Sequence, residues 1–262
     1  MTQTLFGNVA PLKNVAALLA LIDRVENRVP GLPGMATFYG PSGRGKSTAA
    51  TYASNQSGVC HIEVQPLWRA KQMLAGIAAE MGVAKPARTA AALFEQAAES
   101  MQRNQRPLLI DEADRLMRDD MIEVVRGLHE ATGAPVILIG EEELPVKLMR
   151  WERVHGRMLD WVGVQPADLT DVAQLATIYA PTIEITEDLR LSLLISSRRS
   201  HRYVSNNLAR LAEFALARGL SRVTVNDWRG QSFFSGEPPA PRREEVIDLS
   251  RQRQAARAAR RA

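Results

Sequence analysis

The sequence has 262 residues, 45% of them apolar, which is enough for one α/β domain of about 150 to 170 residues and a smaller appendage. No run approaches the roughly 18 apolar residues of a membrane helix, and the first residues lack the pattern of a signal peptide. The single cysteine, Cys60, excludes an internal disulfide and a metal cluster built on several cysteines. These features favour a cytoplasmic protein.

The net charge of +4 comes from the end of the chain. Residues 238–262 hold seven arginines and three acidic residues, which leaves 26 basic and 26 acidic residues in 1–237. Since the body is neutral, any contact with duplex DNA must come from a local patch, from subunits arrayed along the polymer, or from the basic tail. The tail has few apolar residues to bury, and we expect it to be disordered until it meets a partner.

The first two thirds of the sequence alternate strand and helix patterns. Strands are predicted at 35–39, 61–64, 108–111, 135–139 and 160–164. Helices are predicted at 12–28, directly after Thr48, and at 67–81, 89–104 and 120–132, with Thr89 as an N-cap. This alternation predicts an α/β fold with a doubly wound parallel sheet and right-handed crossovers.

From residue 166 onward the pattern becomes helical. Helices are predicted at 170–180, 186–196, 201–217 and 224–229, and no further strand is expected. The predicted domains are therefore an α/β nucleotide-binding domain at 1–165, a small all-helical lid at 166–235 and the basic tail at 236–262.

A glycine-rich segment between the first strand and the next helix has the spacing of a phosphate-binding loop. Glycines permit unusual dihedrals and close approach, so that backbone N–H groups converge on phosphates. Lys46 is expected to reach the β- and γ-phosphates, and the Ser47 hydroxyl to bind Mg²⁺. The predicted nucleotide-binding residues of this loop are Gly40, Pro41, Ser42, Gly43, Arg44, Gly45, Lys46, Ser47 and Thr48.

A second motif follows at the apolar strand 108–111. The carboxyl ends of parallel strands face the ligand crevice, so Asp111 is placed to hold Mg²⁺ and Glu112 to polarise the attacking water. Together the two motifs predict Mg²⁺-dependent hydrolysis of ATP. The letters DEAD at 111–114 do not indicate a helicase, because the chain has one phosphate loop and too few residues for a second core; Asp114 is interpreted as a surface residue or a helix cap.

Five segments together resemble the AAA+ ATPases, specifically the initiator-like branch with the Mu B-type and transposon ATPases that select target DNA. They are GPSGRGKST (40–48), LLIDEAD (108–114), VILIGEEEL (136–144), ERVHGRM (152–158) and SHRYVSNNLARLAEFALARG (200–219). The first two are specific for a P-loop ATPase, and the order and spacing of the other three support the resemblance.

The resemblance implies further site residues. Glu141 stands where the family has a polar sensor, usually Asn, Ser or Thr; the alternative is that it caps the next helix. Arg157, or else Arg153, corresponds to the arginine that a neighbouring subunit presents to the γ-phosphate, and the two are predicted to share a helix face. Arg202 corresponds to the second sensor in the lid, with Arg198 and Arg199 close by.

The resemblance also implies ATP-dependent self-association on duplex DNA, as a ring or a filament, and delivery of that DNA to a transposase. Candidate DNA contacts are Arg69, Lys71 and Arg88, whereas Trp68 is expected to pack in the core. The chain is expected to lack the separate N-terminal DNA-binding domain of the Mu B protein. A helicase loader or replication initiator, a small-molecule phosphotransferase and a scaffold that holds ATP without turnover stay open as alternatives.

Overall fold

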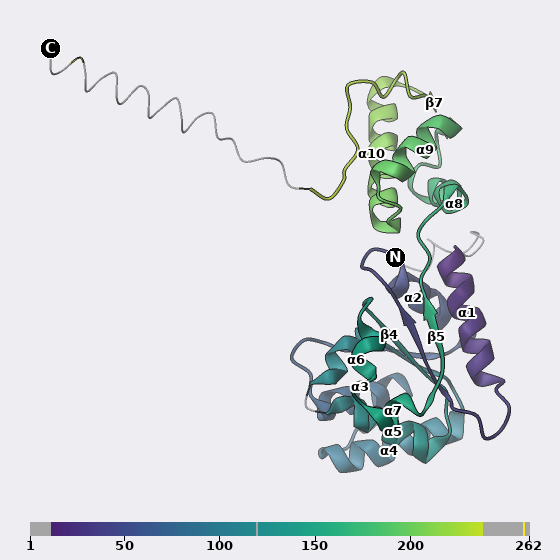
Figure 1. Ribbon diagram of the computed structural model, residues 1–262, viewed down its shortest axis with the longest axis vertical. Coiled ribbons are helices and arrows are strands. Elements are labelled where there is room, and N and C mark those ends of the chain that lie inside the picture. Colours follow the sequence, from purple (N-terminus) through teal and green to yellow (C-terminus); the bar gives the residue numbers. More distant parts are fainter. Residues whose placement is uncertain (1–11, 119, 238–258, 260–262) are drawn as a thin grey trace.

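The computed structural model describes residues 12–118, 120–237 and 259, and it shows two lobes joined by one extended segment (Figure 1). The larger lobe is an α/β core, and the smaller lobe is a lid that follows the last core strand. The predictions about the basic tail fall almost entirely on residues outside the described ranges. Among the helices that are described, none is both long and apolar enough to cross a bilayer.

The predicted doubly wound parallel sheet is confirmed. Its strands are β1 (Met35–Tyr39), β2 (Cys60–Glu63), β3 (Leu108–Asp111), β4 (Val136–Gly140) and β5 (Met158–Gly163). They pair in parallel in the order β2-β3-β4-β1-β5. Because β1 lies inside the sheet beside β4, the loop that follows β1 emerges next to the carboxyl ends of β3 and β4.

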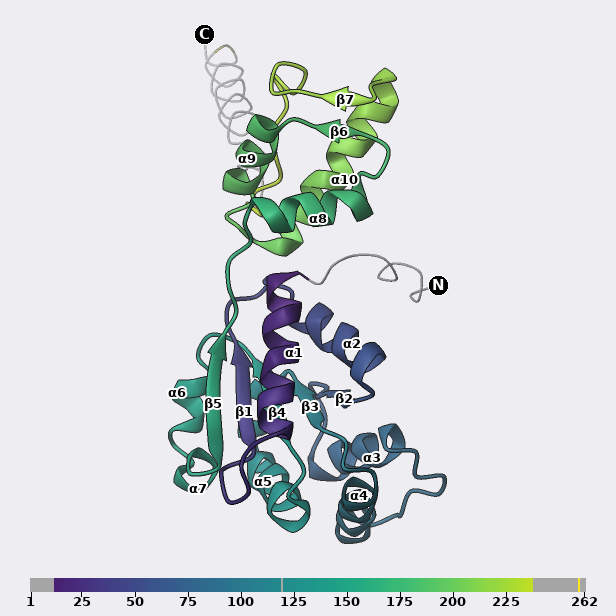
Figure 2. The same cartoon turned by 90° about the vertical axis from the view of Figure 1, so that its right-hand side faces the viewer.

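Helices cover both faces of the sheet (Figure 2). One face packs against α1 (Lys13–Glu26) and α2 (Lys46–Ser57), and the other against α3 (Ala70–Glu80), α4 (Ala90–Asn104) and α5 (Met121–Thr132). Successive strand residues alternate between these two layers: in β4, Ile137 and Ile139 face α1 and α2, whereas Val136 and Leu138 face the other layer. Each fully buried aliphatic side chain of this kind contributes about 1.5–3 kcal/mol.

Several short elements of the core differ from the sequence prediction. The helix predicted at 67–81 begins only at Ala70, because Pro66 and Leu67 form a turn closed by the bond from Trp68 N to Gln65 O. The predicted N-cap is confirmed, since Thr89 Oγ1 accepts a hydrogen bond from Ala92 N. Two short helices, α6 (Leu144–Leu148) and α7 (Glu152–His155), lie where the sequence implied a helix after Glu141 and one around Arg153, whereas η1 (Ala113–Met117) was not predicted.

The lid contains α8 (Leu169–Tyr179), α9 (Glu187–Ser196) and α10 (His201–Arg218) around its own apolar core. The prediction of an all-helical lid is wrong, because β6 (Glu184–Ile185) and β7 (Arg222–Val223) pair in parallel. The helix predicted at 224–229 is also wrong. Thr224 and Asp227 cap a single turn there, and Gly230, at φ 79°, ends it.

Candidate nucleotide-binding site

The loop between β1 and α2 has a backbone that requires glycine. Gly40, Gly43 and Gly45 have φ values of 150°, 78° and 83°. A Cβ atom on Gly40 would lie 2.4 Å from Val164 Cγ2, and one on Gly43 would lie 2.7 Å from Ser200 Oγ. The loop leads directly into α2, whose first N–H groups have no partner within the helix, so this backbone is suited to binding an anion.

Lys46, the first residue of α2, is buried at this loop with 8% of its surface exposed. Its Nζ donates to Gly40 O at 2.6 Å and Pro41 O at 3.1 Å, and it lies 3.4 Å from Glu141 Oε1. The ammonium group is therefore held at the carboxyl ends of β1 and β4, where the loop backbone and a carboxylate surround it.

The end of β3 brings two carboxylates to the same place. Asp111 is 3% exposed, and its Oδ1 accepts the N–H of Glu112 at 2.8 Å. Glu112 has a left-handed backbone, at φ 56° and ψ 37°, which is uncommon for a residue with a side chain. Its carboxylate is partly exposed and pairs with Arg115 Nη2 at 3.2 Å.

Asp114 is not the surface residue that the sequence suggested. Its side chain is 15% exposed, accepts a hydrogen bond from Glu141 N at 2.7 Å and pairs with Lys147 Nζ at 2.8 Å. The bond to Asp114 raises the pKa of Lys147. Glu141 does not cap the next helix either: Glu143 is the residue at that position, and the Glu141 side chain lies beside Lys46. Asp114 thus ties the ends of β3 and β4 together.

The lid reaches the glycine loop through the start of α10. Ser200 Oγ donates to Gly43 O at 3.2 Å, and Arg202 N donates to the same oxygen at 3.1 Å. Arg202 Nη1 lies 3.4 Å from Ser42 Oγ. The geometry therefore places Arg202 at the loop, from the other lobe.

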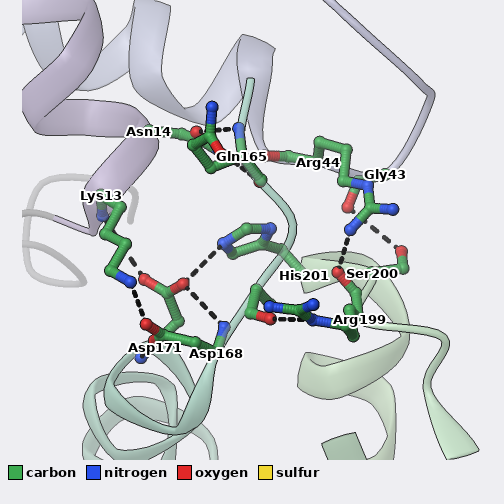
Figure 3. A network of polar contacts seen from close by, with 11 residues as sticks. Lys13, Asn14, Gly43, Arg44, Gln165, Asp168, Asp171, Arg199, Ser200 and His201 are labelled. Carbon is green, nitrogen blue, oxygen red and sulfur yellow. Dashed lines mark hydrogen bonds and ion pairs between the residues drawn. The ribbon is translucent and has the colours of Figure 1, made fainter. Parts of the chain in front are cut away.

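A second group of contacts joins the loop to the segment between the lobes (Figure 3). Asn14, at the start of α1, is 2% exposed; its Nδ2 donates to Arg44 O and Gln165 O, both at 2.9 Å, and its Oδ1 accepts from Gln165 N at 2.8 Å. Arg44 does not face the cavity; its Nη1 donates to Arg199 O. Burial, and then the charge of Arg199, lower the pKa of the Arg44 guanidinium.

An acid lies buried where α1, α8 and α10 begin (Figure 3). Asp171 is fully buried; its Oδ1 lies 3.4 Å from Lys13 N, and its Oδ2 lies 3.1 Å from Asp168 N and 3.5 Å from His201 Nε2. Burial acts to raise the pKa of Asp171, but the contacts with His201, Asp168 and Lys13 hold it below its ordinary value. Lys13 Nζ pairs with Asp168 beside it.

These groups surround a cavity of about 430 Å³ between the core and the lid. Its polar lining includes the glycine loop, Asp111, Glu112, Glu141 and Arg202, and apolar side chains come from α1 and α8. The residues of the two lobes that line it are Leu12, Val15, Ser42, Gly43, Gly45, Lys46, Ser47, Thr48, Tyr52, Asp111, Glu112, Gly140 and Glu141 from the core, and Leu175, Ile178, Tyr179, His201, Arg202, Ser205, Asn206 and Ala209 from the lid. A cavity with a cationic, N–H-rich floor and an apolar wall fits a nucleoside triphosphate.

The two candidate finger arginines do not lie on one helix. α7 ends at His155, and Arg157 lies in the turn before β5, so the prediction of a shared helix face is wrong. Arg157 O accepts Met35 N at the start of β1, and its guanidinium pairs with Glu130 Oε1 at 2.8 Å. The loop follows the other end of β1, roughly 13 Å away along the strand. Arg153 is exposed, with no side-chain hydrogen bond or ion pair to the described residues.

The candidate DNA contacts lie outside the cavity. Arg69, Lys71 and Arg88 are all exposed, the first two at the start of α3 and the third between α3 and α4. Trp68 packs against the core as expected, with its ring 3.0 Å from where a Cβ on Gly76 would lie.

Several site residues were missed from the sequence, among them Asn14, Asp171, Ser200 and His201. Asn14 could have been found from the sequence, because it is a polar residue on the buried side of α1, next to Val15. The contacts of the other three with the loop and with α1 could not be read locally, since they come from helix ends that meet only in the folded chain.

The α/β fold, the glycine loop and the carboxylates at the strand ends define a P-loop ATPase core. Residues 31–148 match the family model described as an AAA domain. The core is an AAA+ core, and it continues into a lid.

Solved structures with a similar fold include two that the chain matches over most of its length. The Orc1 protein of Aeropyrum pernix, solved in complex with DNA, is 18% identical with a TM-score of 0.56, over 85% of this chain and 66% of that one. Cdc6p of Pyrobaculum aerophilum is 15% identical with a TM-score of 0.63, over 87% of this chain and 70% of that one. The chain thus spans about two thirds of the length of these proteins. No curated protein matches it.

Proposed function

We propose that this chain is an ATP-dependent, non-sequence-specific DNA-binding ATPase that assembles on duplex DNA and delivers target DNA to a transposase. The observation that carries the ATPase part is the cavity, which combines the glycine loop, Lys46 and two acidic side chains with a wall supplied by the lid. DNA binding and delivery are supported by the resemblance of the five motifs and by the basic side chains at α3.

Six polar residues of the cavity have a role in this proposal. Lys46 and the loop N–H groups bind the β- and γ-phosphates, and Arg202 touches the nucleotide from the lid. Ser47 and Asp111 hold Mg²⁺, which needs few protein ligands and offsets charge on the phosphates when bound. Glu112 accepts a proton from the attacking water, while Glu141 fixes the position of Lys46 through their 3.4 Å contact.

Arg157 supports hydrolysis in trans. It lies at the end of the sheet opposite its own cavity, so it reaches a γ-phosphate only in a neighbouring copy. In the single copy, the Arg157 guanidinium is paired with Glu130. A nucleotide bound between two copies stabilises the assembled state, and its hydrolysis favours dissociation.

A replication initiator or helicase loader is the second candidate. The specific observation that favours it is the fold likeness to the Orc1 protein, which was solved with DNA. The two candidates differ in sequence preference. An initiator binds its own site about 10³-fold or more above other duplexes, whereas a delivery protein binds unrelated duplexes with similar affinity at a stated salt concentration.

Light scattering tests the proposal directly. The protein is mixed with ATP alone, with duplex alone and with both, and the duplex is varied in sequence. Growth of the signal only with both components, on every sequence, supports the proposal; a monomer that DNA does not affect would favour a small-molecule phosphotransferase. Lys46→Ala is the control: it should lose nucleotide binding and assembly together, so ATP-dependent DNA binding by this variant would contradict the role of the loop.

A further inference from the structure

The turn between β2 and α3 presents an exposed leucine. Leu67 is 91% exposed, the highest value among the exposed large apolar side chains of the described residues. It follows Pro66 in a four-residue turn closed by the 3.1 Å hydrogen bond from Trp68 N to Gln65 O. Proline is favoured at the second position of such a turn, here Pro66. The side chain of the third residue, Leu67, then lies at the tip of the turn.

Contacts from both sides hold this turn in place. Trp68 packs its ring on α3 at Gly76. From the other side, Arg118 Nη1 donates to Pro66 O at 3.3 Å, and Arg115 Nη1 donates to Val64 O. An exposed leucine on a braced turn loses little conformational freedom when it is buried by a partner, so this geometry favours binding.

Basic side chains flank the leucine. Arg69 and Lys71 are exposed on the α3 side and Arg118 is exposed on the η1 side, whereas Glu63 at the end of β2 and Asp120 after Arg118 are exposed acidic residues. Figure 2 shows β2 and α3 together at one edge of the core. An apolar tip between cations is the arrangement by which proteins enter the minor groove: the cations bind phosphates, and the tip enters a base step.

We propose that Leu67 inserts between base pairs of duplex DNA, with Arg69, Lys71 and Arg118 on the flanking phosphates. This rests on the proposed DNA-binding function and adds a mode of binding to it. Insertion unstacks one base step and bends the duplex. Pyrimidine–purine steps such as TA and CA unstack most easily, so the protein prefers flexible sites although it reads no base edges.

The turn also connects to the ATP site. Val64 N donates to Asp111 O at 3.1 Å, and Arg115 contacts both Val64 O and the Glu112 carboxylate. The turn and the Glu112 carboxylate therefore share one partner, Arg115.

A duplex of about 30 base pairs with 2-aminopurine beside a TA step tests the insertion in the presence of ATP at fixed salt, because the fluorescence of this base rises when it unstacks. Wild type should raise the fluorescence. Leu67→Ala should lose the rise and bind about tenfold more weakly, as expected for loss of one buried leucine side chain, with unchanged ATP binding. Leu67→Met should retain both signals. Leu216→Ala is the matched control, since Leu216 is 84% exposed on α10 and should behave as wild type.

The possible failures can be told apart. A wild-type protein that binds no duplex overturns the proposed function. One that binds without a fluorescence rise, or a Leu67→Ala variant that keeps the rise, overturns only the insertion. If the wild type also self-associates with ATP in the absence of DNA and Leu67→Ala does not, the leucine is a contact between protein copies and the insertion is wrong.

Discussion

Replacing Asn14 with alanine tests whether the first turn of α1 holds the two lobes in register. The side chain is almost fully buried and makes three hydrogen bonds, to Arg44 O, Gln165 O and Gln165 N. A buried polar group left without its partner costs about 1–3 kcal/mol. Gln165 is exposed, so water can replace part of its hydrogen bonding. We therefore expect the free energy of unfolding to fall by about 2–4 kcal/mol when these three backbone groups lose the Asn14 side chain.

Urea denaturation monitored by tryptophan fluorescence measures this loss, and titration with a fluorescent ATP analogue measures its effect on the cavity. We expect weaker nucleotide binding as well, because Arg44 O belongs to the glycine loop. Asn27→Ala is the matched control: this residue is exposed at the other end of α1, its side chain donates to Asp23 Oδ1 and to no other described residue, and the change should alter the stability by less than about 0.5 kcal/mol. Equal stability of the two variants would refute the reasoning.

Three further outcomes are expected. Glu112→Gln should bind ATP and stay on DNA longer, because water is no longer activated; faster release in stopped-flow dissociation would count against Glu112 as the base. Arg157→Ala and Lys46→Ala should each lack ATPase activity, yet a mixture should recover part of it if the arginine acts in trans; a mixture that stays inactive contradicts this. Asp171→Asn should destabilise the protein at neutral pH. The contacts with His201, Asp168 and Lys13 hold the pKa of Asp171 below the ordinary value of an aspartate, so the contribution of its charge to stability is complete above that ordinary value and is lost as pH falls through the lower folded value. The difference from wild type should therefore shrink in acid, and a pH-independent difference in urea midpoints would show that the charge plays no part.

The sequence by itself determined the α/β core. Its strands are apolar runs, α1 has a clear helical period, and the glycine loop joins positive-φ glycines to a helix N-terminus directly after a strand. Asp111 was placed correctly at a strand end for the same local reason. The lid strands β6 and β7 left no such pattern: each has two residues, too short for an alternation, and the paired residues are 38 positions apart in the sequence.

Only the tertiary structure decided how the site is completed. Asp114 turned out to be a link between strand ends, Arg44 to face the lid, and Arg157 to lie at the opposite end of the sheet from its own cavity. Asn14, Asp171 and His201 come together because three helices begin at one point, which no spacing along the chain encodes. Local periodicity specifies elements, but burial and charge pairing between distant residues arise only when those elements pack.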